Sequence, residues 1–160
     1  MATKVQKGAA WVTICVALTS GFEGLRQNAY PDVTGVPTIC FGETRGVSMT
    51  DHKTKAECQA MLEGRLQEFA DEVDRCTKVP LPPARKAAMV DFAYNLGAGR
   101  YCSRIAPLLD AGKTVEACNH LLKFNTAGGV VFPGLTRRRE AERQLCLPNE
   151  DQPENSQVQN

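Results

Sequence analysis

Seven cysteines are spread along this chain of 160 residues, and their spacing restricts what the chain can fold into. No two of them form a CxxC pair, which argues against a zinc ribbon and against a thioredoxin-type motif. The two histidines, His52 and His120, stand far apart and in no metal-ligand motif, so we expect no bound metal. Widely spaced cysteines favour disulfides made in an oxidising compartment, with buried free thiols as the alternative. An odd number leaves at least one cysteine without a bridge inside the chain.

The composition is ordinary for a soluble domain, with 42% hydrophobic residues, 23% charged residues and a net charge of +1. A chain of this length buries a sizeable core as one domain. The near-neutral charge gives no reason to expect nucleic acid as a partner, and we expect a monomer. Residues 1–20 nevertheless carry two lysines and no acid, whereas residues 148–160 carry three acids and no base. We expect this polar tail to be disordered.

Two carboxylates and a hydroxyl lie close together between residues 21 and 44. Glu23 follows an apolar segment, Asp32 stands in a Tyr-Pro-Asp loop, and Thr38 lies on a short β-type run. Two acids can cleave a glycosidic bond, because one donates a proton while the other stays ionised. We expect desolvation to favour the neutral form of Glu23 and a solvated turn to keep Asp32 ionised. The alternative is a helix-end acid, a turn former and a threonine chosen for β-propensity.

Three separated motifs strengthen the catalytic interpretation. The first combines E-G-L-R, Y-x-D and P-T-I-C-F-G, with its Glu, Asp and Thr at intervals of nine and six residues. The others are FAYNLGAGR at 92–100 and GLTRRREAERQLC at 134–146, with Ala-Gly-Gly at 127–129 before the last. Together they resemble the T4-type phage lysozyme family (glycoside hydrolase 24), especially the endolysins of lambdoid phages. The resemblance covers most of residues 21–147.

The resemblance implies an α+β, lysozyme-like fold that is mainly helical, with a small antiparallel sheet lobe and a cleft between the lobes. It implies an inverting muramidase that hydrolyses the β-1,4 bond between N-acetylmuramic acid and N-acetylglucosamine in peptidoglycan, without a cofactor. The catalytic residues would be Glu23 as general acid, Asp32 and Thr38. Asn95, in the second motif, would bind substrate in the cleft, with a plain helix C-terminal residue as the alternative. Arg137 begins a basic run that is either a solvated face or a contact for the carboxylates of the peptide stems. Two alternatives remain open: a lytic transglycosylase, which would work without Asp32, and a non-enzymatic cell-wall binding protein.

The family fold also suggests which cysteines are neighbours. The expected disulfides are Cys40–Cys58, Cys76–Cys102 and Cys118–Cys146, with Cys15 left over. Two positions depart from the family pattern, since Cys40 stands where glycine is frequent and Glu43 where histidine is frequent. We expect Glu43 to alter a supporting contact near the acid and to leave the acid itself in place.

The first 20 residues combine a basic start with a weakly apolar stretch. No small-residue cleavage site of a signal peptide is present, and the stretch is short for a permanent transmembrane helix, which needs about 20 apolar residues. An ordinary first helix fits, because apolar residues recur at helical spacing. The residues of this stripe are Trp11, Ile14, Cys15, Leu18 and Phe22.

The same stretch resembles the signal-arrest-release segment of some phage endolysins. Residues 8–20 would then lie transiently in the host inner membrane, with the enzyme at its periplasmic face and later free in the periplasm. Cys15 would exchange into a disulfide on release, unless it is simply a buried thiol. If residues 1–20 are an ordinary helix instead, the enzyme stays in the host cytoplasm until a holin releases it.

We therefore divide the chain into an N-terminal apolar segment (1–20), a catalytic domain (21–147) and a polar tail (148–160). Thr54 and Glu57 form a capping box that begins a long helix. Its expected inner face consists of Cys58, Leu62, Phe69 and Val73. We expect a buried helix from residue 82 to 96, short helices at 103–111 and 114–124, a loop at 127–134 and a last helix to 146. Thr114 and Thr136 are the expected caps of the last two helices.

Overall fold

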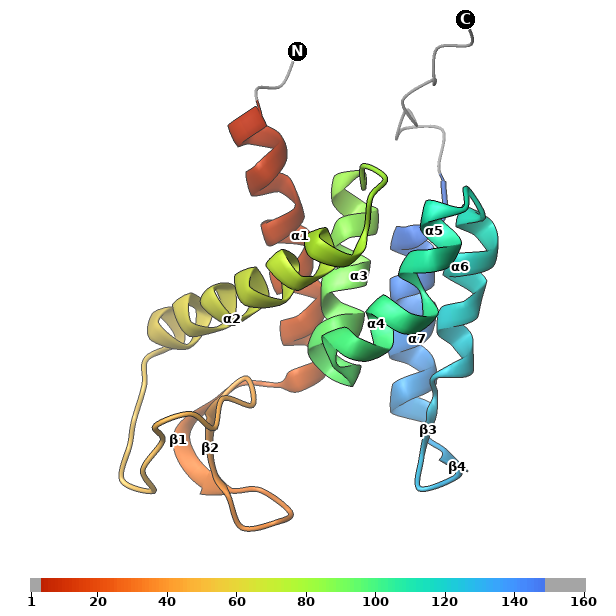
Figure 1. The fold of residues 1–160 in the computed structure, drawn as a ribbon. Coiled ribbons are helices and arrows are strands. Elements are labelled where there is room, and N and C mark those ends of the chain that lie inside the picture. Colours follow the sequence, from red (N-terminus) through yellow and green to blue (C-terminus); the bar gives the residue numbers. More distant parts are fainter. Residues whose placement is uncertain (1–3, 149–160) are drawn as a thin grey trace, which may run out of the picture.

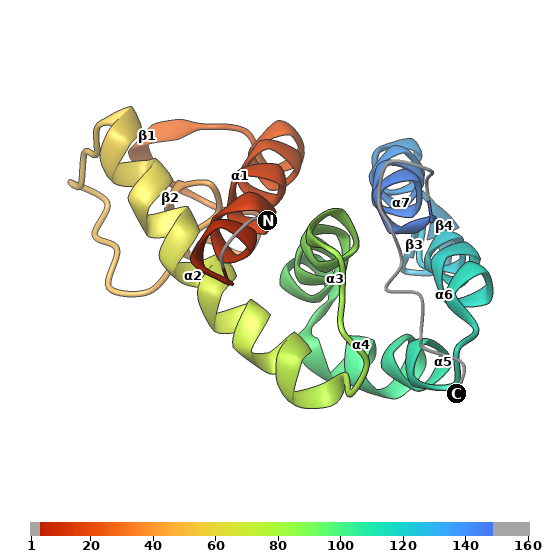
Figure 2. The ribbon, with the colours of Figure 1, turned by 90° about the horizontal axis from the view of Figure 1, so that it is seen from above.

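The computed structural model describes residues 4–148 of the chain (Figure 1). The elements in order are α1 (Lys4–Glu23), β1 (Arg26–Pro31), β2 (Pro37–Cys40), α2 (Lys55–Cys76), α3 (Pro83–Leu96), α4 (Ala98–Arg104), α5 (Ala106–Asp110), α6 (Thr114–His120), the 3-10 helix η1 (Leu121–Lys123), β3 (Thr126–Ala127), β4 (Val130–Val131) and α7 (Pro133–Cys146). The pair β1–β2 forms a small lobe at one end of α2, and the remaining helices gather at its other end (Figures 1 and 2). The expected fold class, mainly helical with a small antiparallel sheet, is confirmed.

Helix α3 is the centre of the helical lobe and packs against α1, α2 and α7 (Figure 2). It starts with a proline in its first turn, where the missing N–H costs nothing, and ends at Gly97, whose φ of 92° suits glycine. Its apolar side chains from Ala87 to Ala93 are completely buried, as expected of a central helix. One buried residue of this helix is a carboxylate, Asp91, and burying a charge requires a partner.

Helix α2 begins at the predicted capping box, in which Thr54 and Glu57 satisfy each other's backbone N–H groups. Its buried face consists of Cys58, Leu62, Leu66, Ala70 and Val73. Phe69 was expected on this face but is only partly buried, and its ring makes an edge contact with Tyr94 on α3. Phe69 therefore packs against the core from the edge of this face, and the expected inner face of α2 is confirmed.

Helix α1 buries a narrower stripe than predicted. Trp11, Cys15 and Thr19, each four residues apart, are buried, whereas Phe22 is 37% exposed. Thr19 was not part of the predicted stripe. It lies on the inner face of α1 because its hydroxyl donates a hydrogen bond to Asp91 there. Within residues 4–148, no helix combines the length and the apolar character needed to cross a bilayer.

Strands β1 and β2 pair in antiparallel register, with Tyr30 opposite Thr38 and Pro31 opposite Pro37. The loop between them turns at Gly35, whose φ of 85° suits glycine. After β2 the chain turns again through Cys40, whose φ is 61°, and Gly42, whose φ is 91°. This second turn brings the backbone of residues 41–43 toward α3.

All three predicted disulfides are confirmed: Cys40–Cys58, Cys76–Cys102 and Cys118–Cys146. The first joins β2 to α2, the second joins the end of α2 to α4, and the third joins α6 to the end of α7. Cys15 is the free cysteine and is completely buried. Burial, with the nearby charge of Asp91, raises the pKa of its thiol to about 12.

The C-terminal half differs from the prediction in four details. The helix expected at 103–111 is two helices, α4 and α5, which break at Ile105. Thr114 is the first residue of α6 and makes no cap, and Thr136 lies inside α7, which starts at Pro133. The loop at 127–134 contains the small β3–β4 hairpin. Of the polar tail at 148–160, all but Pro148 lies outside the described residues.

Candidate active site

A cavity of about 280 Å³ opens between the sheet lobe and the helical lobe. Its wall comes from the end of α1, the turn after β2, one face of α2 and the end of α3. The lining residues are Glu23, Gly42, Glu43, Thr44, Arg65, Phe69, Tyr94 and Asn95. The structure therefore brings together two of the predicted site residues, Glu23 and Asn95.

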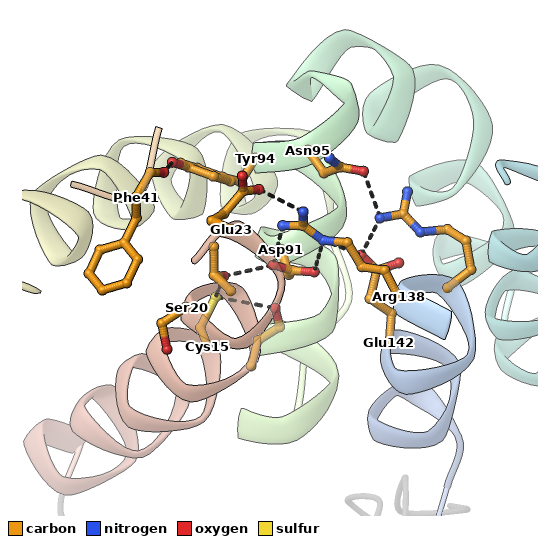
Figure 3. Close-up of polar contacts among 12 residues, drawn as sticks. Cys15, Ser20, Glu23, Phe41, Asp91, Tyr94, Asn95, Arg138 and Glu142 are labelled. Atoms are coloured by element: carbon orange, nitrogen blue, oxygen red, sulfur yellow. Dashed lines mark hydrogen bonds and ion pairs between the residues drawn. The ribbon is translucent and has the colours of Figure 1, made fainter. Parts of the chain in front are cut away.

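Glu23 is the last residue of α1, and its side chain is 25% exposed. Its Oε1 accepts a hydrogen bond of 2.6 Å from Nη1 of Arg138, a residue of α7 (Figure 3). The expected apolar surroundings of Glu23 are therefore not found, since a buried guanidinium contacts the carboxylate directly. A charge-assisted contact of this kind fixes the orientation of the carboxylate.

Arg138 is held in place by Asp91 of the central helix (Figure 3). Nε and Nη2 of Arg138 donate to the two oxygens of Asp91 at 2.9 and 2.8 Å, which is a bidentate pair. Oδ1 of Asp91 also accepts a bond of 2.7 Å from the hydroxyl of Thr19. Burial works to raise the pKa of Asp91, but the hydrogen bonds and charge of Arg138 outweigh it and lower that pKa. Likewise, burial opposes the charge of Arg138, but Asp91 and Glu23 raise its pKa.

Arg139, the next residue, is also buried and positions Asn95. Its Nη2 donates to Oδ1 of Asn95 at 2.9 Å and to Oε1 of Glu142 at 2.7 Å. The amide oxygen of Asn95 is thereby engaged, which leaves its NH2 group as the donor for the cavity. Burial, together with a hydrogen bond shared with Asp91, raises the pKa of Glu142 well above its ordinary value. Burial in this cluster therefore favours the neutral form of Glu142 over its ionised form.

Tyr94 and Gly42 shape the cavity next to the acid. The Tyr94 hydroxyl donates to the carbonyl oxygen of Phe41 at 2.9 Å and so anchors the turn after β2 (Figure 3). Burial and the neighbouring charges of Glu23 and Glu43 raise the pKa of Tyr94 to about 12, so the hydroxyl keeps its proton. A Cβ atom on Gly42 would lie 3.8 Å from Oε2 of Glu23. One oxygen of the acid therefore faces Arg138 and the other faces Gly42 and the cavity.

Glu43, one of the two expected departures from the family pattern, forms an ion pair in the wall of the cavity. Its Oε1 accepts the backbone N–H groups of Thr44 and Arg45, both at 2.9 Å. Its Oε2 lies 3.6 Å from Nε of Arg65, which also pairs with Glu68. Partial burial opposes ionisation of Glu43, but the hydrogen bonds from Arg45 and Thr44 lower its pKa. The carboxylate thus closes its own turn and orients an arginine.

Asp32 and Thr38 lie in the sheet lobe, outside the set of residues that line this cavity. Oδ1 of Asp32 accepts three bonds, from the hydroxyl and N–H of Thr34 at 2.8 Å each and from the N–H of Val36 at 2.9 Å. Led by the Thr34 hydroxyl, these bonds lower the pKa of Asp32. Thr38 is buried on β2, and its hydroxyl donates to the carbonyl oxygen of Val36 at 2.9 Å. Both side chains are held by the same short loop.

Four residues of the site were not predicted from the sequence: Asp91, Arg138, Arg139 and Glu142. Of the arginine run, only Arg137 was predicted to bind substrate, and the structure places it exposed and outside the lining of the cavity. The available signal was the spacing of Glu142, four residues after Arg138 and three after Arg139, which puts them on one side of a helix. Among the described residues, no cluster of His, Cys, Asp or Glu could hold a metal ion.

A two-lobed, mainly helical fold with a carboxylate at the mouth of its inter-lobe cavity defines a lysozyme-type glycoside hydrolase. The sequence profile of the phage lysozyme family matches residues 20–142, and the chain belongs to this family. It is a peptidoglycan-hydrolysing endolysin.

Individual relatives agree with this placement. The SAR-endolysin of Bacteriophage PS119 is 37% identical over 129 residues, covering 79% of this chain and 77% of the relative. The SAR-endolysin of Pseudomonas phage phiKMV is 37% identical over 148 residues, covering 90% and 92%. Among solved structures, the muramidase domain of SpmX from Asticaccaulis excentricus has a TM-score of 0.79 at 27% identity, covering 84% of this chain and 95% of that one. The active form of P1 phage endolysin Lyz has a TM-score of 0.75 at 29% identity, covering 83% and 82%.

Proposed function

We propose that Glu23 is the general acid that protonates the leaving oxygen when the β-1,4 bond between N-acetylmuramic acid and N-acetylglucosamine is hydrolysed. The main support for this proposal is that the two oxygens of the Glu23 carboxyl group have different neighbours. Oε1 is bound by Arg138, whereas Oε2 is directed toward Gly42 and the 280 Å³ cavity. A proton on Oε2 would therefore face the glycosidic oxygen of a sugar bound in the cleft.

Asp32 would be the second carboxylate of the reaction and would remain ionised throughout. Its three hydrogen bonds all end on Oδ1, which leaves Oδ2 to hold the attacking water or to stabilise the oxocarbenium-like transition state. Thr38 would orient the same water or the sugar. Because its hydroxyl hydrogen is used by the Val36 carbonyl, its oxygen would act as an acceptor. If water attacks from the face opposite Glu23, the anomeric carbon is inverted.

Two further residues would bind the substrate. The NH2 group of Asn95 lines the cavity and would donate to a sugar hydroxyl or acetamido oxygen. Arg137 is exposed near the start of α7 and would contact the acidic peptide stems outside the cavity. No cofactor takes part in these steps, and we propose that the enzyme acts as a monomer.

We further propose that residues 8–20 lie in the host inner membrane before the enzyme is released to the periplasm. The support is that several relatives at 36–37% identity are named SAR-endolysin and that all three disulfides suit an oxidising compartment. After release, the stripe of Trp11, Cys15 and Thr19 would pack on the enzyme as it does in α1. The test is fractionation of the full-length protein before and after the membrane potential is collapsed. A protein that is soluble from the beginning would contradict the proposal.

Glu23→Gln tests the catalytic assignment, because it keeps the shape and the contact with Arg138 but cannot donate the proton. We expect release of reducing ends from purified peptidoglycan to be abolished in a variant that remains folded by circular dichroism. Retention of about a tenth of the activity would overturn the assignment, since the proton donor contributes at least about 100-fold. Glu43→Gln, the other carboxylate of the cavity, should keep measurable activity and shows whether Glu43 could be the acid instead.

The products of the reaction also distinguish hydrolysis from the two alternatives that the sequence alone left open. A lytic transglycosylase would leave 1,6-anhydro ends on its sugars, whereas hydrolysis leaves reducing ends. A protein that binds the wall without releasing reducing ends would be a binding module. We expect reducing ends from the wild-type chain and neither of the other outcomes.

A further inference from the structure

Helix α1 contacts the catalytic cluster at two points that are one helical turn apart. Glu23 accepts from Arg138, and Thr19, four residues earlier, donates to Asp91. Asp91 in turn binds Arg138 through both of its oxygens. The four side chains therefore form a closed chain of hydrogen bonds, from α1 through α3 and α7 and back to α1 (Figure 3).

The chain of contacts is buried except at Glu23, which borders the cavity. Thr19 and Asp91 are completely buried, and Arg138 is only 5% exposed. Short bonds link them, at 2.7 Å from Thr19 to Asp91 and at 2.6 Å from Arg138 to Glu23. In such surroundings a carboxylate that loses a donor turns toward its remaining partners, because no water replaces the missing bond.

We propose that Thr19 is a positioning residue for the reaction, which acts through Asp91 and Arg138 to set the orientation of the catalytic acid Glu23. This inference rests on the proposed role of Glu23. The Thr19 hydroxyl binds Oδ1, the same oxygen that receives Nη2 of Arg138. It thereby fixes the rotation of the Asp91 carboxylate and with it the plane of the guanidinium. That plane decides whether Nη1 reaches Oε1 of Glu23 and leaves Oε2 facing the cavity.

A purely structural account of Thr19 is also simple: its hydroxyl satisfies a buried acceptor and stabilises the packing of α1 on α3. The two accounts predict different kinetics. If Thr19 only stabilises the fold, its loss lowers the melting temperature but leaves kcat unchanged at temperatures where the protein is folded. If Thr19 orients the acid, its loss lowers kcat while KM, which reports sugar contacts elsewhere in the cleft, hardly changes.

The decisive variant is Thr19→Val, which keeps the shape and deletes only the hydroxyl. In the full-length purified chain, we expect kcat for hydrolysis of isolated peptidoglycan to fall about tenfold and KM to change by about twofold or less. Thr19→Ser restores a hydroxyl at the same place and should recover kcat to within about threefold of wild type. Ser20→Ala is the matched control, because the neighbouring hydroxyl bonds only to the backbone of its own helix. It should have wild-type kcat.

Two results would overturn the inference. One is a folded Thr19→Val enzyme with wild-type kcat, and the other is a Thr19→Ser enzyme as impaired as Thr19→Val. Should Thr19→Val fail to fold, Thr19→Ala takes its place with the same expectation for kcat. The proposed function is judged separately by Glu23→Gln: a wild-type kcat in Thr19→Val beside an inactive Glu23→Gln refutes only the positioning role. An active Glu23→Gln refutes the assignment of the acid.

Discussion

Nη1 of Arg138 lies 2.6 Å from Oε1 of Glu23, although 115 residues separate them in the sequence. A buried guanidinium needs compensation on several sides, and Asp91 and Glu23 together supply it. The contact therefore does two things. It joins the helix that ends in the acid to the last helix of the fold, and it selects which oxygen of Glu23 faces the cavity.

Replacing Arg138 by lysine should separate the effect of its positive charge on activity from the effect of its hydrogen-bond geometry. Lysine keeps the positive charge but cannot bind both oxygens of Asp91 and reach Glu23 at the same time. We expect Arg138→Lys to lower kcat by about tenfold or more, in an enzyme that is also less stable. Arg143→Lys on the same helix is the control, since that side chain is half-buried, lies outside the ion-pair cluster and donates to Asn119. Equal kcat values for the two variants would show that the fork geometry of Arg138 is not needed.

Gly42 should tolerate no side chain without loss of activity. A Cβ there would be 3.8 Å from Oε2 of Glu23, between the acid and the cavity, and the φ of 91° disfavours any other residue. Gly42→Ala should cost about 1–2 kcal/mol of stability and should lower kcat/KM as well. Gly112→Ala is the matched control, because its φ is 75° and it has no atom within 4 Å. It should show a similar stability loss, measured by urea unfolding, and normal kcat/KM.

The local parts of this fold could be read from the sequence, because the residues that determine them are close in the chain. The capping box of α2 needs only Thr54 and Glu57, and the limits of α3 need only a proline and a glycine. The disulfides were predicted because the family resemblance placed each pair on neighbouring elements. In each case the deciding information was a short motif.

The ion-pair cluster could not be predicted in the same way. The sequence alone does not show which of three consecutive arginines faces the core, because this depends on how α7 is rotated about its axis. In the structure, Arg138 and Arg139 are buried and Arg137 is exposed. The burial of Thr19 depends on Asp91, which is 72 residues away, so a hydrophobic pattern along α1 could not detect it. The roles of Asp32 and Thr38 remain predictions.

The Cys118–Cys146 disulfide should be a large contributor to stability. It closes a segment of 28 residues and anchors the end of α7, the helix that carries Arg138. Replacing both cysteines by alanine should lower the free energy of unfolding by about 3 kcal/mol, measured with guanidinium chloride. Cys15→Ala is the comparison, because it removes a buried sulfur that forms no bridge and should cost clearly less. A smaller loss in the double variant than in Cys15→Ala would contradict this prediction.

The thiol of Cys15 should be inert in the folded enzyme. It is completely buried, donates to the carbonyl oxygen of Ala87 at 3.4 Å, and has a pKa raised to about 12. Because the thiolate is the reactive form, a disulfide reagent should not label the native protein at neutral pH. About one thiol per chain should react once the protein is denatured, since the other six cysteines are paired. Rapid labelling of the native enzyme would show that α1 opens readily.

Glu142 should make the protein less stable as the pH rises above the acidic range. Its pKa in the folded chain is raised well above its ordinary value of 4.5, by burial and by the bond shared with Asp91. Between these two pKa values the unfolded chain has lost a proton that the folded chain still holds, so stability falls with increasing pH. The slope approaches about 1.4 kcal/mol per pH unit at most. The lowered pKa of Asp91 acts in the opposite direction, but only below its ordinary value of 3.8.

Glu142→Gln removes this dependence, because an amide copies the donor and acceptor of the neutral acid but cannot ionise. We expect the free energies of unfolding of the variant and the wild type to be most similar near pH 4, which is below the ordinary pKa of Glu142. From there toward neutral pH, the variant should become progressively the more stable of the two. Unfolding in urea at a series of pH values measures the difference. Parallel curves for the two proteins would mean that Glu142 is ionised in the folded state, and that the cluster holds three buried or half-buried carboxylates against its two arginines.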